Sequence, residues 1–301
     1  MEINSLKKLE EITVFRPLII LSLVLNHSIV KISAGGSRVS GYSAPDFYNY
    51  FNDFNFAFTL EAFALISGYV MAYQLFILKR DYSFKSFAYR KFKRLIIPML
   101  VFGIAYYFMF LFEQSTFSVL SFLVRLLSGC GHLWFLPMLF WGQLILFFLV
   151  KKNYPSKYVW PMLLIISLVP TPHLPLGFER LAHFMLWIYA GSELLQLKNI
   201  VIQKMNMGVI LLLGGVMVML VVIRNLVLPD MESAMPIIDK VAFYVRNEII
   251  GIPMKASGIL AVYFLICKYT GNDSYIPSKV ITFMSEMSFG IYLIPLVSTK
   301  N

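Results

Sequence analysis

The chain has 301 residues, of which 58% are hydrophobic and only 14% are charged. Soluble domains carry about 25% charged residues, so this composition excludes a water-soluble globule. The net charge of +10 does not indicate a nucleic-acid-binding protein, because the basic residues lie beside apolar stretches instead of forming a separate basic face. We expect an all-α polytopic transmembrane bundle, with one integral membrane domain over residues 1–301.

Apolar stretches in chain order predict about nine membrane spans, because a helix crosses the hydrocarbon with about 20 apolar residues. The stretches cover residues 14–33, 56–77, 95–112, 133–150, 158–170, 180–197, 207–223, 249–267 and 280–298. The fifth is short for a crossing. Lys and Arg collect in alternate loops, which predicts a cytoplasmic N-terminus. The same rule predicts that the loops 31–55, 113–131, 171–180 and 224–248 lie outside.

Two polar residues in the first span are the leading functional candidates, because ionisable groups in hydrocarbon are costly. Arg16 and His27 are eleven residues apart, so they project from one helix face with an axial separation of about 16 Å. A slender ligand held at Arg16 by an anionic end would reach His27. Snorkelling of Arg16 and a helix–helix hydrogen bond of His27 are the alternatives.

Further charged residues mark other spans. Glu61, in the second span, would orient His27 or act as a protonated packing residue. Arg90 and Arg94 stand one turn apart before the third span, where two guanidinium groups suit phosphate. Positive-inside charge and contact with anionic lipid are the alternatives for both arginines. Lys255, in the eighth span, is expected to snorkel to a helix end without a functional role.

Two further candidates, His132 and Trp134, lie at the outer start of the fourth span. Trp134 offers a flat aromatic face to a ligand, although tryptophan also favours membrane interfaces in general. Cys130 and Cys267 lie in or next to separate apolar segments, so neither a disulfide framework nor a metal site is expected.

Five motifs follow one another in order along nearly the whole chain. They are Arg16-(ten residues)-His27, Phe63-Ala-Leu-Ile-Ser67-Gly68-Tyr69, Arg90 through Arg94-Leu-Ile-Ile-Pro98, His132-Leu-Trp134-Phe-Leu136-Pro137 and Met287-Ser-Phe-Gly-Ile-Tyr-Leu-Ile294. This series resembles the acyltransferase 3 family of integral membrane acyltransferases. Each motif is weak alone, and their order makes the resemblance specific.

The resemblance implies an enzyme that takes an acyl group, commonly acetyl, from cytoplasmic acyl-CoA. The group would pass to a hydroxyl of a cell-surface polysaccharide or lipid-linked sugar. It also implies that His27 is essential and that Arg16, Arg90 and Arg94 associate with acyl-CoA, which is a co-substrate. Neither a permanently bound cofactor nor a metal is expected. The partners would be membrane lipid, acyl-CoA and the glycan acceptor, in a bacterial-type cytoplasmic membrane.

For the mechanism, we expect neutral His27 to act as a general base on the acceptor hydroxyl, with a covalent acyl-histidine as the alternative. Glu61 would support His27, and Ser67 joins His132 and Trp134 as a possible acceptor-site residue.

The sequence departs from the family pattern near its end. Pro295 stands where the family usually has a histidine, and the chain stops at Asn301, so we expect the usual final helix to be missing. Two other functions are open. One is a transporter or flippase of lipid-linked sugars. The other is a membrane-bound O-acyltransferase of an unrelated superfamily, for which His183 is the candidate histidine.

Overall fold

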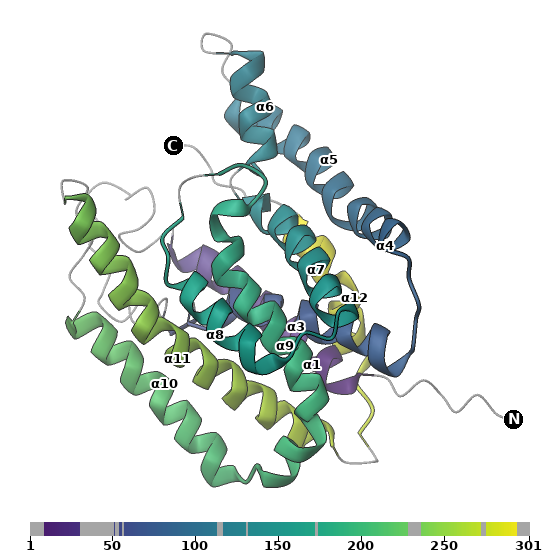
Figure 1. Cartoon of the computed structure of the whole chain (residues 1–301), viewed down its shortest axis with the longest axis vertical. Coiled ribbons are helices and arrows are strands. Elements are labelled where there is room, and N and C mark those ends of the chain that lie inside the picture. Colours follow the sequence, from purple (N-terminus) through teal and green to yellow (C-terminus); the bar gives the residue numbers. More distant parts are fainter. Residues whose placement is uncertain are drawn as a thin grey trace, which may run out of the picture. The chain divides into compact units, whose positions relative to one another are not determined.

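The computed structural model describes residues 9–30, 51, 54–55, 57–112, 117–130, 132–171, 174–227, 236–271 and 275–293. All regular structure within these ranges is helical, which confirms the predicted all-α class. The elements in chain order (Figure 1) are α1 (Glu10–Val30), α3 (Thr59–Ala72), η1 (Tyr73–Ile77), α4 (Phe84–Lys91), η2 (Phe92–Ile96), α5 (Ile97–Tyr106), η3 (Tyr107–Leu111), α6 (Val119–Leu127), η5 (His132–Trp134), α7 (Phe135–Lys151), α8 (Ser156–Ser167), α9 (Phe178–Lys204), α10 (Met207–Val227), α11 (Ile237–Thr270) and α12 (Lys279–Leu293).

Each predicted span overlaps a helical stretch of the described chain. Among the described residues, four helical stretches are long and apolar enough to cross a membrane, namely Thr59–Ile77, Phe84–Leu111, Met207–Val227 and Ile237–Thr270, and Phe135–Lys151 is a shorter apolar helix. Helix α8 has only 12 residues, about 18 Å at 1.5 Å per residue, as its short apolar stretch predicted. The total of about nine spans stays a prediction.

Two parts of the chain are more helical than the sequence indicated. Helix α11 begins at Ile237 and runs for 34 residues, about 51 Å, which exceeds the roughly 30 Å of hydrocarbon. Its early turns lie beside α10, where the Arg224 Nε donates to Asn247 Oδ1 at 2.9 Å. Helix α6 occupies the predicted outer loop 113–131, because its apolar residues follow helical spacing and Leu126 is buried.

Side-chain caps define the starts of several helices. The Ser83 hydroxyl accepts from the Ser86 N–H before α4 at 3.3 Å, and Asn206 Oδ1 accepts from the Val209 N–H before α10 at 2.9 Å. Such caps satisfy backbone donors that the first turn of a helix leaves without partners. They explain why the helices begin at these polar residues between apolar stretches.

Three stretches, η1, η2 and η3, are π-helical. In η2 the Ile97 N–H donates to the carbonyl of Phe92, five residues earlier. Pro98 follows directly, and a proline has no N–H to donate to the carbonyl four residues before it, which belongs to Arg94. The wider turn accommodates this proline within a continuous helix from Phe84 to Leu111.

The helices form two compact units. Unit 1 comprises Met1–Phe63 and Leu197–Tyr292, and unit 2 comprises Ala64–Gln196 and Leu293–Asn301. The boundaries fall within α3, within α9 and before the last residue of α12, so these three helices contribute residues to both units.

In unit 1, α10 and α11 run side by side (Figure 1). A Cβ on Gly258 would overlap the sulfur of Met217, so the glycine allows these helices to approach closely. Helix α1 packs against α11 through Phe15 and Tyr263, whose ring centroids lie 6.2 Å apart and whose side chains are fully buried. The helix that carries Arg16 and His27 is thus part of the core of unit 1.

In unit 2, two glycines bring α3 and α9 into backbone contact. A Cβ on Gly68 would overlap the Ile188 carbonyl, and one on Gly191 would overlap the Leu65 carbonyl. Helix α7 joins them at Gly142, against the side chain of Ile188. Small residues at helix crossings are typical of membrane bundles, in which packing drives association.

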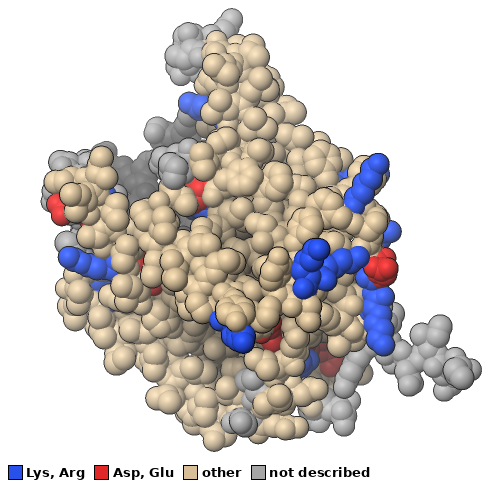
Figure 2. All heavy atoms as spheres, viewed as in Figure 1, with Lys and Arg blue, Asp and Glu red and all other residues tan. Residues whose placement is uncertain are grey.

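Large apolar side chains remain exposed on several helices, including Met109 (71% exposed), Leu120 (72%) and Leu226 (77%). The face in Figure 2 carries few Lys, Arg, Asp or Glu side chains among many uncharged ones. Lipid tails are a suitable environment for such a surface and water is not. The chain is an integral membrane protein.

Candidate functional site

Arg16 and His27 both lie on α1, as predicted. Their eleven-residue separation corresponds to about 16 Å along this helix. The Arg16 side chain is partly buried in unit 1. The side chains of His27 and His132 lie outside the described residues, as does the whole of His173.

A buried polar strip runs along α1 toward His27. The Ser22 hydroxyl donates to Asn55 Oδ1 at 3.0 Å and lies 3.5 Å from the Thr59 hydroxyl. Asn26, one turn after Ser22, is only 2% exposed, and its Nδ2 has no hydrogen-bond partner among the described residues. Buried polar atoms are normally paired, so this strip is an exceptional feature of an otherwise apolar bundle.

Glu61 and Lys255 form an ion pair inside unit 1. The Lys255 Nζ lies 2.8 Å from Glu61 Oε1, and the two side chains are 13% and 4% exposed. The expectation that Lys255 snorkels to a helix end is wrong. Because α11 begins at Ile237 and ends at Thr270, Lys255 lies near the middle of the helix. Glu61 supplies its counter-charge from α3.

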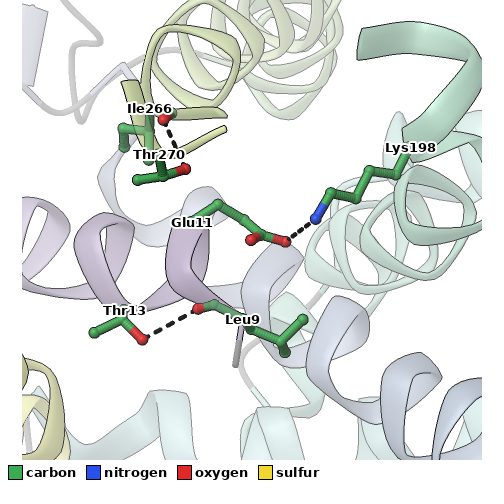
Figure 3. A network of polar contacts seen from close by, with 6 residues as sticks. All are labelled: Leu9, Glu11, Thr13, Lys198, Ile266 and Thr270. Carbon is green, nitrogen blue, oxygen red and sulfur yellow. Dashed lines mark hydrogen bonds and ion pairs between the residues drawn. The ribbon is translucent and has the colours of Figure 1, made fainter. Parts of the chain in front are cut away.

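A second ion pair in unit 1 joins the start of α1 to the end of α9 (Figure 3). The Lys198 Nζ lies 2.5 Å from Glu11 Oε1, with side chains 28% and 8% exposed. Near it, the Thr13 hydroxyl donates to the carbonyl of Leu9, just before α1, and the Thr270 hydroxyl donates to the carbonyl of Ile266 at the end of α11. The ion pair and the Thr13 bond hold the first turn of α1 in place.

Arg90 and Arg94 lie in unit 2 on the continuous α4–η2 helix, and both side chains are exposed. The Arg90 guanidinium lies 5.0 Å from the centre of the Tyr82 ring, a cation–π arrangement that orients it. Arg94 lies within the widened η2 turn, and Arg90 lies two residues before it. Within unit 2 the two arginines form an exposed cationic segment of this helix.

The acceptor-site candidates of unit 2 have defined neighbours. Gln143 Nε2 of α7 donates to the Ser67 hydroxyl, and Gln143 is buried. The Arg180 guanidinium lies 4.1 Å from the centre of the Trp134 ring, so it covers one face of the indole. Within the described ranges, no three His, Cys, Asp or Glu side chains come close enough together to hold a metal ion.

Comparison with known families gives the decisive observation. The family model described as the acyltransferase domain of acyltransferase 3 matches residues 9–297. The chain belongs to this family. It is therefore a membrane acyltransferase. No curated protein and no solved structure gives a significant match.

The structure explains two motifs of this acyltransferase in physical terms. In Phe63 to Tyr69, Gly68 permits the backbone contact between α3 and α9 and Ser67 bonds to α7. In Arg90 to Pro98, the proline follows a π-helical turn that contains Arg94.

The sequence indicated no functional role for Lys255, Gln143 or Arg180. Each of them contacts a candidate site residue, namely Glu61, Ser67 and Trp134 in that order. Lys255 is a lysine within an apolar stretch, which is itself a signal of a buried partner. Gln143 is likewise polar within an apolar helix. Arg180 also forms an ion pair with its sequence neighbour Glu179, at 3.3 Å.

Proposed function

We propose that this acyltransferase moves an acyl group, with acetyl as the first candidate, from cytoplasmic acyl-CoA to a hydroxyl of a cell-surface polysaccharide or lipid-linked sugar. We further propose the bacterial cytoplasmic membrane as its location, because donor and acceptor then lie on opposite sides.

The observation that carries this proposal is the presence of Arg16 and His27 on one helix, about 16 Å apart along its axis. CoA is a polyphosphate on a long flexible arm. A guanidinium near the cytoplasmic end of α1 suits phosphate, and the arm would carry the thioester into the membrane toward His27.

In the proposed reaction, neutral His27 removes the proton of the acceptor hydroxyl as its oxygen attacks the thioester carbonyl carbon. The new ester C–O bond forms and the C–S bond breaks. The CoA thiolate leaves and takes the proton back from the imidazolium. Histidine suits this cycle because the unperturbed pKa of an imidazole side chain lies near neutral pH.

The remaining residues receive supporting roles in this proposal. Arg90 and Arg94 would hold CoA phosphates, which their exposure on α4–η2 permits. Ser67, His132 and Trp134 would contact the acceptor. Because Arg180 covers one face of Trp134, a sugar would stack on the other face or displace the guanidinium.

The test is transfer of labelled acetyl groups from acetyl-CoA in membrane vesicles that contain the surface glycan. We expect label in the glycan with the wild-type protein and none with His27→Ala at equal protein level. His183→Ala is the matched control, because it removes the other histidine of a membrane helix, and it should retain activity.

Three outcomes would overturn the proposal. Undiminished transfer by His27→Ala would remove the catalytic role of His27. Loss of activity in His183→Ala alone would favour the mechanism of the unrelated O-acyltransferase superfamily. Movement of a lipid-linked sugar across the vesicle membrane without acyl transfer would identify a flippase.

A further inference from the structure

The ion pair between Glu61 and Lys255 is the strongest feature that the proposed chemistry leaves unused. Both charges lie on helices long and apolar enough to cross the membrane. Their side chains are 4% and 13% exposed, and their charged atoms lie 2.8 Å apart. Intramembrane charges of this kind are expensive and usually functional.

Stability alone does not account for the pair. Removing two charges from water costs about as much as their attraction returns, and neutral side chains of similar size often serve equally well. A bundle that needed only packing between α3 and α11 would be served by apolar residues at positions 61 and 255. The pair therefore points to an electrostatic role.

The contacts of unit 1 connect the two helices of this pair to α1, the helix that carries His27. Helix α1 meets α11 through Phe15 and Tyr263. It meets the start of α3 through Ser22, which contacts Asn55 and Thr59. The pair itself joins α3 to α11. Thus α1, α3 and α11 form one three-helix group with fixed charges inside it.

We propose that Lys255 is a positioning residue for acyl transfer, which acts by holding the Glu61 carboxylate in a fixed orientation within this three-helix group. The inference rests on the proposed function. Positive charge develops on His27 when it takes the acceptor proton, and a fixed carboxylate stabilises such charge without needing to reorganise. Lys255 supplies the opposite charge that a buried carboxylate requires.

The experiment reverses the pair. Glu61→Lys/Lys255→Glu keeps an ion pair and the net charge but exchanges the positions of the two charges. Glu61→Gln/Lys255→Met removes both charges at similar volume. We expect both variants to assemble with melting temperatures near that of the wild type. We expect kcat for acetyl transfer to fall about tenfold or more, with KM for acetyl-CoA changed by no more than about twofold. Lys255→Arg keeps the positive charge at position 255 and should therefore retain most of the wild-type kcat.

The matched control is a different ion pair of unit 1, in the double variant Glu11→Lys/Lys198→Glu. That pair lies at the start of α1 and joins it to α9 (Figure 3), so its reversal should leave kcat near the wild-type value.

A wild-type kcat in the reversed 61/255 variant would overturn the inference. An ion pair that serves only structure should work equally well when its two charges exchange positions. If that variant does not assemble, the Gln/Met variant decides alone, and wild-type kcat there has the same meaning. His27→Ala, measured in parallel, separates the two proposals. Activity that requires His27 but not the direction of the pair would overturn only this inference.

Discussion

Gly68 of α3 lies directly against the carbonyl oxygen of Ile188 of α9, so closely that a Cβ at position 68 would overlap that oxygen. Gly191 makes the reciprocal approach to the Leu65 carbonyl. The two glycines form one backbone crossing between helices that are far apart in the sequence. This crossing fixes the position of Ser67, the neighbour of Gly68, whose hydroxyl accepts a hydrogen bond from Gln143 of α7.

Gly68→Ala should therefore destabilise the protein strongly. The added methyl group meets backbone, which cannot rotate away, so we expect a cost at the upper end of the roughly 1–3 kcal/mol typical of overpacking. Thermal unfolding in detergent measures it. Gly214→Ala on α10 is the control, because a Cβ there meets no atom within 4 Å. Equal melting temperatures for the two variants would refute the crossing.

The helices were predictable because apolar segments of this length have few alternatives to a helix in lipid. The Glu61–Lys255 pair was not, because 194 positions separate its members and only the packing of α3 on α11 reveals their contact. The same holds for Arg180 over Trp134. The length of α11 was underestimated because its first turns include Asp239, Lys240 and Arg246, which hydropathy excludes from a span.

Native thiols should react slowly with maleimide in the folded protein. Cys130 is 2% exposed, and burial raises the pKa of its thiol, an effect only partly opposed by nearby Arg125. A raised pKa leaves less reactive thiolate at neutral pH. Cys267 is also buried. Mass spectrometry after labelling at pH 7 should find little adduct before unfolding and two adducts after it. Rapid adduct formation on native protein would contradict this environment.

Because the native thiols should react slowly, single introduced cysteines permit a test of membrane orientation. Ser128 is exposed just after α6, in the loop predicted to lie outside, and Lys85 is exposed on α4, in the loop predicted to be cytoplasmic. A membrane-impermeant maleimide should label Ser128→Cys in intact cells and label Lys85→Cys only after permeabilisation. The reverse pattern would place the N-terminus outside and remove access of cytoplasmic acyl-CoA to Arg90 and Arg94.

If Arg90 and Arg94 bind CoA phosphates as proposed, their replacement should weaken donor binding. A hydrogen bond to a charged group contributes about 1.5–3 kcal/mol, so Arg90→Gln and Arg94→Gln should each raise KM for acetyl-CoA about tenfold or more with little change in kcat. Arg94→Lys should recover only part of this loss, because an ammonium lacks the planar fork of a guanidinium.

The control for this prediction is Lys85→Gln, which removes one positive charge from the same helical stretch at an exposed position. A general attraction of anions to the basic surface would make its effect equal to that of the arginine variants and would weaken with added salt. A specific phosphate site requires the arginine variants to lose much more. Steady-state kinetics in vesicles at two salt concentrations would separate these cases, and equal losses in all three Gln variants would refute the specific site.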